Sequence, residues 1–159
     1  MKARKAYVKA GWPVAIPVSN GKKYPPAEGT TGNVPAPTPG KLDEIWDEYE
    51  PTKPNLALRL HSGREEFDVI TVDVDHYGVK TGVDTIRELE KQLGGFPWSA
   101  PMSTRRDPST QTGQYFFRVR KGVSWKGAVG PGVDVIQDTH RYAVVYPSIV
   151  DGSQYRWYI

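Results

Sequence analysis

Two aspartates end a strongly apolar run near the middle of the 159-residue chain. The run covers residues 69–75 and reads VITVDVD. β-Branched residues favour a strand, and because a strand alternates its faces, Asp73 and Asp75 should project from the same side. Two carboxylates roughly 7 Å apart on one face of a buried sheet repel each other unless a cation lies between them. Mg²⁺ and Mn²⁺ prefer such oxygen ligands, so the pair is a candidate metal site; a strand end that reaches solvent is the alternative.

A third aspartate, Asp134, lies inside a second β-branched segment, GVDVI at 132–136. An acid within a buried strand needs a partner, and either a shared metal ion or a salt bridge with a neighbouring arginine would serve. Together the three acids fit the two-metal arrangement for nucleotidyl transfer, in which paired ions hold the attacking and leaving oxygens.

Short helices and strands must position these acids. Apolar periodicity predicts helices at 2–10, 42–49 and 83–93, with Pro39 in the first turn of the second and Thr81 capping the third. Residues 19–40 and 103–113 should be loops. Strands are expected at 13–18, 55–61, 67–75, 114–121, 133–137, 141–147 and 154–158. Helices alternate with strands in the early part of the chain, whereas the late part has strands in succession. This order indicates an α/β (α+β) domain around a mixed or antiparallel sheet.

Composition narrows the class of protein. With 38% hydrophobic and 25% charged residues, the chain has the balance of a soluble globular protein, and its length suits a single domain over 1–159. It has no cysteine, which excludes disulfides and thiolate metal sites. Since no apolar run resembles a membrane span or signal peptide, we expect a cytoplasmic protein without a membrane partner. The apolar end at Ile159 suggests the N-terminal part of a longer protein.

The charges are segregated although the net charge is only +3. Basic side chains gather in residues 1–23 and 101–126, and acidic ones in residues 28–50. This segregation suits a surface that meets phosphates, and Arg105 and Arg106 are the candidates for contact with nucleic acid. Ordinary solvated faces are the alternative interpretation.

Taken in order, the segments resemble the bifunctional primase–polymerase domain of the archaeo-eukaryotic primase superfamily, found in phage and plasmid replication proteins. The similarity spans nearly the whole chain. The matching pieces are GWPV at 11–14 with the Lys22-Lys23 loop, NLALR at 55–59, VDVD at 72–75, GQYFFRV at 113–119, GVDV at 132–135, YAVVYPS at 142–148 and YRW at 155–157.

The resemblance implies that Asp73, Asp75 and Asp134 hold two Mg²⁺ or Mn²⁺ ions. They would lie on an RRM-like sheet beside a smaller N-terminal α/β lobe. It also implies a DNA primase and DNA polymerase that makes and extends primers from NTPs or dNTPs on a single-stranded DNA template. A fused or associated helicase and, for a phage protein, the host cytoplasm are expected.

One position departs from the family pattern. Gln114 stands where the family has a histidine that meets the phosphates of the incoming nucleotide. Glutamine can donate a hydrogen bond but carries no charge, so basic neighbours should supply the field. Arg118 is the strongest candidate, since period two puts it on the face of Gln114, about 13 Å along the strand. The other candidates for phosphate contact are His140, Arg141, Lys22 and Lys23.

Two other classes of protein remain as alternatives. The first is a single-stranded-DNA-binding domain of the same fold that has lost catalysis, which the glutamine at position 114 favours. The second is an unrelated metal-dependent enzyme, such as a nuclease or a DxD sugar transferase. The second alternative leaves the match of the late segments unexplained.

Overall fold

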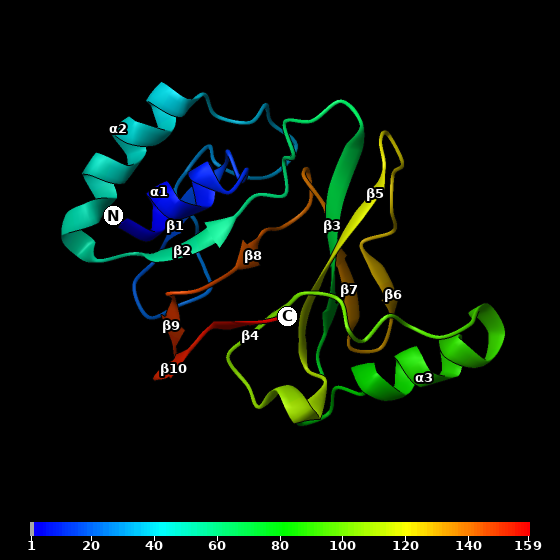
Figure 1. Cartoon of the computed structure of the whole chain (residues 1–159). Coiled ribbons are helices and arrows are strands. Elements are labelled where there is room, and N and C mark those ends of the chain that lie inside the picture. The colour runs from blue at the N-terminus through cyan, green and yellow to red at the C-terminus, as the bar shows by residue number, and fades with distance from the viewer. Residues whose placement is uncertain (1) are drawn as a thin grey trace.

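The computed structural model describes residues 2–159, in which three α-helices lie against antiparallel sheets (Figure 1). The helices are α1 (Lys2–Lys9), α2 (Pro39–Tyr49) and α3 (Gly82–Leu93), with 3₁₀ turns η1 (Glu50–Thr52) and η2 (Pro108–Thr110). The strands are β1 (Ala15–Val18), β2 (Asn55–Leu58), β3 (Phe67–Val74), β4 (Met102–Thr104), β5 (Gly113–Arg120), β6 (Ala128–Gly130), β7 (Val133–Ile136), β8 (Ala143–Val144), β9 (Ile149–Val150), β10 (Ser153–Gln154) and β11 (Arg156–Tyr158). The predicted α+β class is confirmed.

The larger sheet has the strand order β11-β4-β5-β3-β7-β6, so β3 is flanked by β5 and β7. Helix α3 follows β3 and covers one face of this sheet. Its residues Val83 and Ile86 pack against Val74, Tyr115 and Val133. Where a β-α-β-β-α-β unit would have a second helix, residues 121–132 form a loop and β6.

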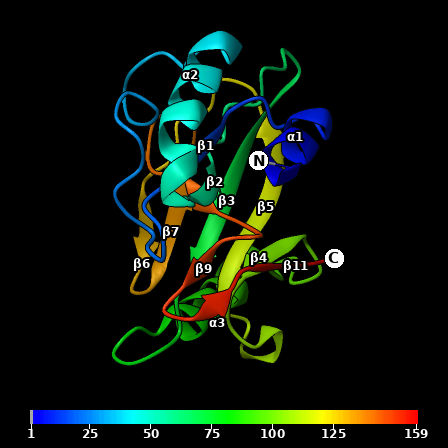
Figure 2. The ribbon, with the colours of Figure 1, turned by 90° about the vertical axis from the view of Figure 1, so that its left-hand side faces the viewer.

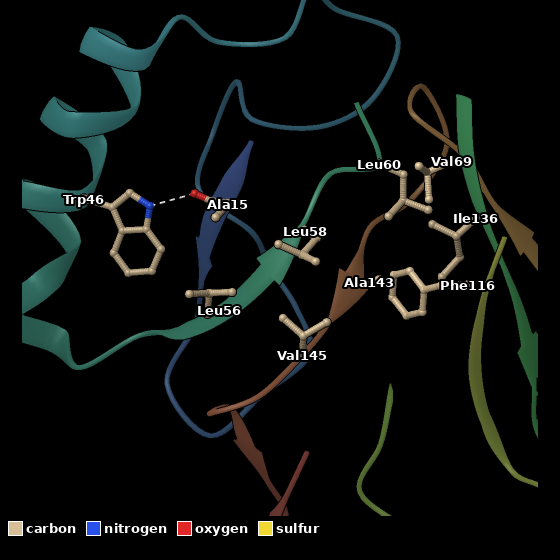
Figure 3. Close-up of a cluster of buried hydrophobic side chains, with 10 residues drawn as sticks. All are labelled: Ala15, Trp46, Leu56, Leu58, Leu60, Val69, Phe116, Ile136, Ala143 and Val145. Carbon is tan, nitrogen blue, oxygen red and sulfur yellow. Dashed lines mark hydrogen bonds between the residues drawn. The ribbon is translucent and has the colours of Figure 1, made fainter. Parts of the chain in front are cut away.

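The smaller sheet, β1-β2-β8, carries α1 and α2 and packs on the other face of β3 and β5 (Figures 1 and 2). Figure 3 shows the shared core, in which Leu60 lies beside Val69 and Ala143 lies beside Phe116 of the large sheet. In the same core, the indole nitrogen of Trp46 donates to the carbonyl of Ala15 at 2.8 Å. Since side chains alternate, Asp73 lies on the same face as Val69, toward the small lobe.

Several boundaries differ from those predicted. The loop expected at 103–113 begins inside β4 and contains η2, because β4 is too short and polar to show a period. The strand expected at 141–147 shrinks to β8, since the left-handed φ of 66° at Arg141 interrupts the extended backbone. The strand expected at 154–158 breaks at Tyr155 into β10 and β11.

The two predictions about helix starts have different outcomes. Pro39 lies in the first turn of α2, as predicted. Thr81 is the N-cap residue of α3, as predicted, but its side chain makes no capping hydrogen bond. None of the described helices is long and apolar enough to cross a membrane.

Candidate active site

Three polar side chains form a row across the centre of the large sheet. Asp73 on β3 lies directly opposite Gln114 on β5 and directly opposite Asp134 on β7. Residues that face each other in an antiparallel pair project from the same side of the sheet, with Cβ atoms about 5 Å apart. Ser103 of β4 continues the row beyond Gln114. The sheet register therefore brings two of the three predicted acids together on the face toward the small lobe.

The third acid, Asp75, follows the last residue of β3 and is held by its backbone. Its N–H donates to the carbonyl of Gly132 at 2.8 Å, and its carbonyl accepts from the N–H of Gly82 at 2.9 Å. A Cβ on Gly132 would lie 2.5 Å from the Asp75 carbonyl oxygen, and one on Gly82 would lie 2.4 Å from that of Gly132. Only glycine allows this close approach, which fixes the place of Asp75 at the strand end.

The electrostatics of Asp73 show that the acids interact. Burial, followed by the negative charge of Asp75, raises the pKa of Asp73 from 3.8 to about 7, and the charge of Asp134 adds to the rise. The positive charges of Lys23 and Lys80 oppose it. A carboxyl whose ionisation is so unfavourable is typical of a site that receives further positive charge when it works.

The other two acids each have a cationic partner. The ammonium of Lys80 bonds to Asp75, and the guanidinium of Arg141 bonds to Asp134 at 2.5 Å. For Asp134 the sequence left open a metal ion or an arginine salt bridge, and the structure contains the arginine pair. The bond to Asp75 raises the pKa of Lys80, so this side chain stays charged.

A small cavity beside the row of Asp134, Asp73 and Gln114 is lined by several basic side chains. Arg106 lies in it with its guanidinium carbon 3.7 Å from the centre of the Tyr77 ring. Arg105 donates to the carbonyl of Val150 and to Asp151. The groups that line the cavity and carry chemistry are Lys23, Asp73, Asp75, Arg105, Arg106, Gln114 and Tyr155.

Gln114 is buried within this cavity, with 7% of its surface exposed. Its side-chain oxygen Oε1 is inaccessible and has no hydrogen-bond partner among the described residues. A buried polar atom without a partner is unfavourable, and at a cavity wall it is typical of a binding site. The position predicted to meet the nucleotide thus lies beside Asp73; its unpaired oxygen is an acceptor, so only the amide N–H groups of Gln114 can donate to a phosphate.

The loop that carries Lys22 and Lys23 is held at its main chain. The Asn55 side-chain amide donates to the Lys22 carbonyl at 2.9 Å, and the Tyr142 hydroxyl donates to the Lys23 carbonyl at 2.7 Å. Lys23 lines the cavity, whereas Lys22 does not. Of the two lysines predicted to contact phosphates, only Lys23 therefore lies at the cavity that contains Asp73 and Asp75.

Arg118 and His140 lie elsewhere. Arg118 faces Val69, nearer the other end of β3, and its guanidinium carbon is 4.9 Å from the centre of the Phe67 ring. The ring of His140 packs against Gly127 in the loop before β6. The structure does not bring Arg118 into the cavity, and Phe116 lies between it and Gln114 on the same strand face.

The three acids suit divalent ions by the type of their donor atoms and by the face of the sheet from which they project. Asp73, Asp75 and Asp134 are hard oxygen donors on one side of the sheet, as Mg²⁺ or Mn²⁺ requires. Across residues 2–159, however, no three acidic or histidine side chains are grouped closely enough to hold an ion as they stand. With Lys80 and Arg141 on two of the carboxylates, the donor set fits the ions, but the acids must first give up these partners.

Sequence reasoning missed several residues of the site. Lys80 follows Asp75 by five positions, and a lysine in a short turn after two acids is a usable signal. Tyr155 lies in the YRW segment that resembles the family, but only the fold brings it to Asp73, whose charge adds to the effect of burial in raising the pKa of the Tyr155 phenol. Arg59 ends the NLALR segment, and only 1% of its side chain is exposed. It donates to Asp138 and to the carbonyls of Thr30, Val34 and Pro35, which ties the loop before α2 to β2.

Comparison with known families agrees with this geometry. Residues 4–159 match the family described as "Bifunctional DNA primase/polymerase, N-terminal" (Prim-Pol). Since the match covers essentially the whole chain, the protein belongs to this family, and a DNA primase/polymerase type of function in replication follows. No curated protein and no solved structure matches the chain.

Proposed function

We propose that the protein is a template-directed nucleotidyltransferase that makes and extends primers by a two-metal mechanism. The observation that carries the proposal is the register that places Asp73 opposite Asp134 and beside Asp75, in a chain that matches the family throughout. Acids gathered on a central strand do not stabilise a sheet, so their presence favours a catalytic role.

Asp73, Asp75 and Asp134 would hold two Mg²⁺ or Mn²⁺ ions. When bound, such ions stabilise negative charge on the attacking and leaving oxygens of an in-line displacement. Asp73 must be ionised to act as a ligand, and the ions lower the energy of that ionisation. The chain's own contribution is to fix the acids, through the sheet register and through the two glycines against Asp75.

The basic and amide side chains that line the cavity beside the acids suit, by their charge and donor type, the phosphates of an NTP or dNTP. Lys23 and Arg106 supply positive charge, and Gln114 supplies an amide at the position of the family's histidine. An arginine guanidinium can donate two hydrogen bonds to phosphate oxygens, and stacking on Tyr77 orients the guanidinium of Arg106. Arg105 and the outer basic residues would then contact the single-stranded template and primer.

A second candidate function is a single-stranded-DNA-binding domain without catalysis. The observation that favours it is the pairing of Asp75 with Lys80 and of Asp134 with Arg141, which satisfies these acids without an ion. In either case we propose a phage or plasmid replication protein that works with a helicase in the host cytoplasm.

Incubation with a single-stranded template, labelled dNTP or NTP, and Mg²⁺ or Mn²⁺ distinguishes the two candidates. Reactions with and without a primer separate extension from initiation. Products whose length follows the template support the transferase. Binding of the template without incorporation in either metal would leave only the binding domain.

A further inference from the structure

We propose that the ammonium of Lys80 neutralises Asp75 and competes with a divalent ion for this carboxylate. Once the ion has displaced it, the ammonium positions the phosphates of the nucleotide. The inference rests on the proposed function, because it assigns a role to Lys80 within the same site. Family membership does not assign a role to this lysine.

The geometry provides the first step. The Lys80 ammonium bonds to the Asp75 carboxylate, whose side chain is only 16% exposed, whereas that of Lys80 is 45% exposed. The lysine therefore reaches in from solvent to an acid at the cavity wall. A divalent ion that binds Asp75 must displace the ammonium, since the two cations repel each other at one carboxylate.

The backbone permits this exchange without rearrangement. Gly82 and Gly132 hold the main chain of Asp75 on both sides, and the N–H of Lys80 donates to the carbonyl of Tyr77 at 3.0 Å. The turn between Asp75 and Gly82 is thus closed by its own hydrogen bonds. Only the flexible stem of Lys80 has to move for the ammonium to leave.

The neighbours of Lys80 indicate where the ammonium goes. The ring of Tyr77 lies against two cations, with the Lys80 nitrogen 5.3 Å and the Arg106 guanidinium carbon 3.7 Å from its centre. Arg106 lines the cavity that we assign to the phosphates. Because its stem stays attached next to the Tyr77 ring, on which Arg106 also lies, we infer that the displaced ammonium meets the negative charge that accompanies the ion.

Mn²⁺ binding measured by the EPR signal of the free ion, without nucleotide or DNA, tests the first half. We expect Lys80→Met to bind Mn²⁺ about two- to fivefold more tightly than wild type, as removal of a partly exposed ion pair allows. Lys80→Arg keeps the charge and should resemble wild type. Lys91→Met removes a comparable lysine–glutamate pair on α3, far from the acids, and should change nothing.

Binding of a non-hydrolysable deoxynucleoside triphosphate in saturating Mn²⁺ tests the second half. Here Lys80→Met should bind about two- to fivefold more weakly than wild type, the opposite direction to its effect on Mn²⁺ alone. A merely structural lysine would not shift the two affinities in opposite directions. Unchanged nucleotide affinity would overturn the role in phosphate binding.

The outcomes also separate this inference from the proposed function. Equal Mn²⁺ affinity in wild type and Lys80→Met would overturn the competition while leaving the transferase in place. Failure of every variant to bind Mn²⁺ would overturn the metal-dependent function and the role of Lys80 with it.

Discussion

Asp73 of β3 and Asp134 of β7 occupy directly opposed positions in the middle of an antiparallel sheet. Like charges at such positions repel, and Asp75 adds a third negative group at the end of the same strand. Lys80 and Arg141 pair with two of the three carboxylates, whereas burial, followed by the charge of Asp75, raises the pKa of Asp73. This unequal distribution of charge underlies the first two predictions.

Removal of a carboxylate should abolish nucleotide addition but not folding. We expect Asp73→Ala and Asp134→Ala each to lower primer extension by at least about 100-fold, because each would remove a metal ligand. Far-ultraviolet circular dichroism should match wild type, since the change relieves repulsion. Asp47→Ala, an exposed acid on α2, is the control and should keep full activity. Full activity of Asp134→Ala would exclude that residue from the site.

Stability should depend on pH through Asp73. Its pKa rises from 3.8 in the unfolded chain to about 7, with burial as the main cause. The folded state then retains a proton that the unfolded state releases, so the contribution of Asp73 to stability is fully present below pH 4 and is lost as the pH rises to about 7. Asp73→Asn cannot ionise, and above pH 7 it should be more stable than wild type by roughly 1–3 kcal/mol. Urea unfolding of both proteins from pH 4 to 8, without divalent ions, measures the difference; parallel profiles would contradict it.

Single-stranded DNA should bind with a steep dependence on salt. Replacement of Arg105 and Arg106 together by glutamate should weaken binding to all template sequences alike, because phosphate contacts carry no base information. The slope of log K against log salt should become shallower by at least about 0.7, the value for one lost phosphate contact on a single strand, because Arg105 is the residue that we assign to the template. Fluorescence anisotropy with labelled oligonucleotides measures this. The matched control reverses Arg87 and Lys91 on α3, which covers the other face of the sheet, and an equal effect there would contradict a specific phosphate-binding groove.

Gln114 and Arg118 should differ in their effect on nucleotide use. The sequence predicted Arg118 as the main phosphate contact, but it lies over Phe67, while Gln114 adjoins Asp73. We now expect Gln114→Ala to raise the KM for nucleotide by about tenfold and Arg118→Ala by less than about twofold. Gln114→His should be tolerated. Steady-state incorporation on a primed template compares the three variants, and a larger effect at Arg118 would restore the original assignment.

The glycines around Asp75 should be essential for stability as well as for the site. Gly132 has a φ of +72°, and a Cβ there would lie 2.5 Å from the Asp75 carbonyl oxygen. We expect Gly132→Ala to lower the free energy of unfolding by about 2–4 kcal/mol, from backbone strain and overpacking together. Gly122 has a similar φ of +77° but no atom within 4 Å of its Cβ, so Gly122→Ala isolates the conformational part. Thermal melting of both variants provides the comparison, and equal losses would rule out the steric contribution.

Much of the site can be predicted from the alternation of side chains between the two faces of a strand. The alternation in residues 69–75 predicts that Asp73 and Asp75 share a face, and the β-branched residues around Asp134 predict a strand. The partner across each strand could not be predicted, because register depends on the loops between strands. For this reason Gln114 was expected near the nucleotide from resemblance alone. Lys80 was missed although it follows Asp75 by only five positions.

The misplacement of Arg118 has a physical cause. The alternation of side chains along β5 correctly places Arg118 on the same face as Gln114. It does not show which side chain fills the space between the two residues. Phe116 occupies that space and packs into the core between the lobes. The short strands β4, β6 and β9 were missed for a related reason: two or three residues cannot display a period, and their pairing depends on neighbours distant in the chain.

The anchoring of the loop that carries Lys23 has a thermodynamic consequence. Asn55 and Tyr142 fix its main chain at Lys22 and Lys23, and Arg59 fixes the stretch around Val34. The conformational entropy of this long segment is therefore lost when the protein folds, not when a nucleotide arrives. Affinity then reflects contacts with a preorganised surface, and association should bury little additional apolar area. Calorimetry of nucleotide binding should accordingly show a heat-capacity change much smaller than that of coupled folding and binding.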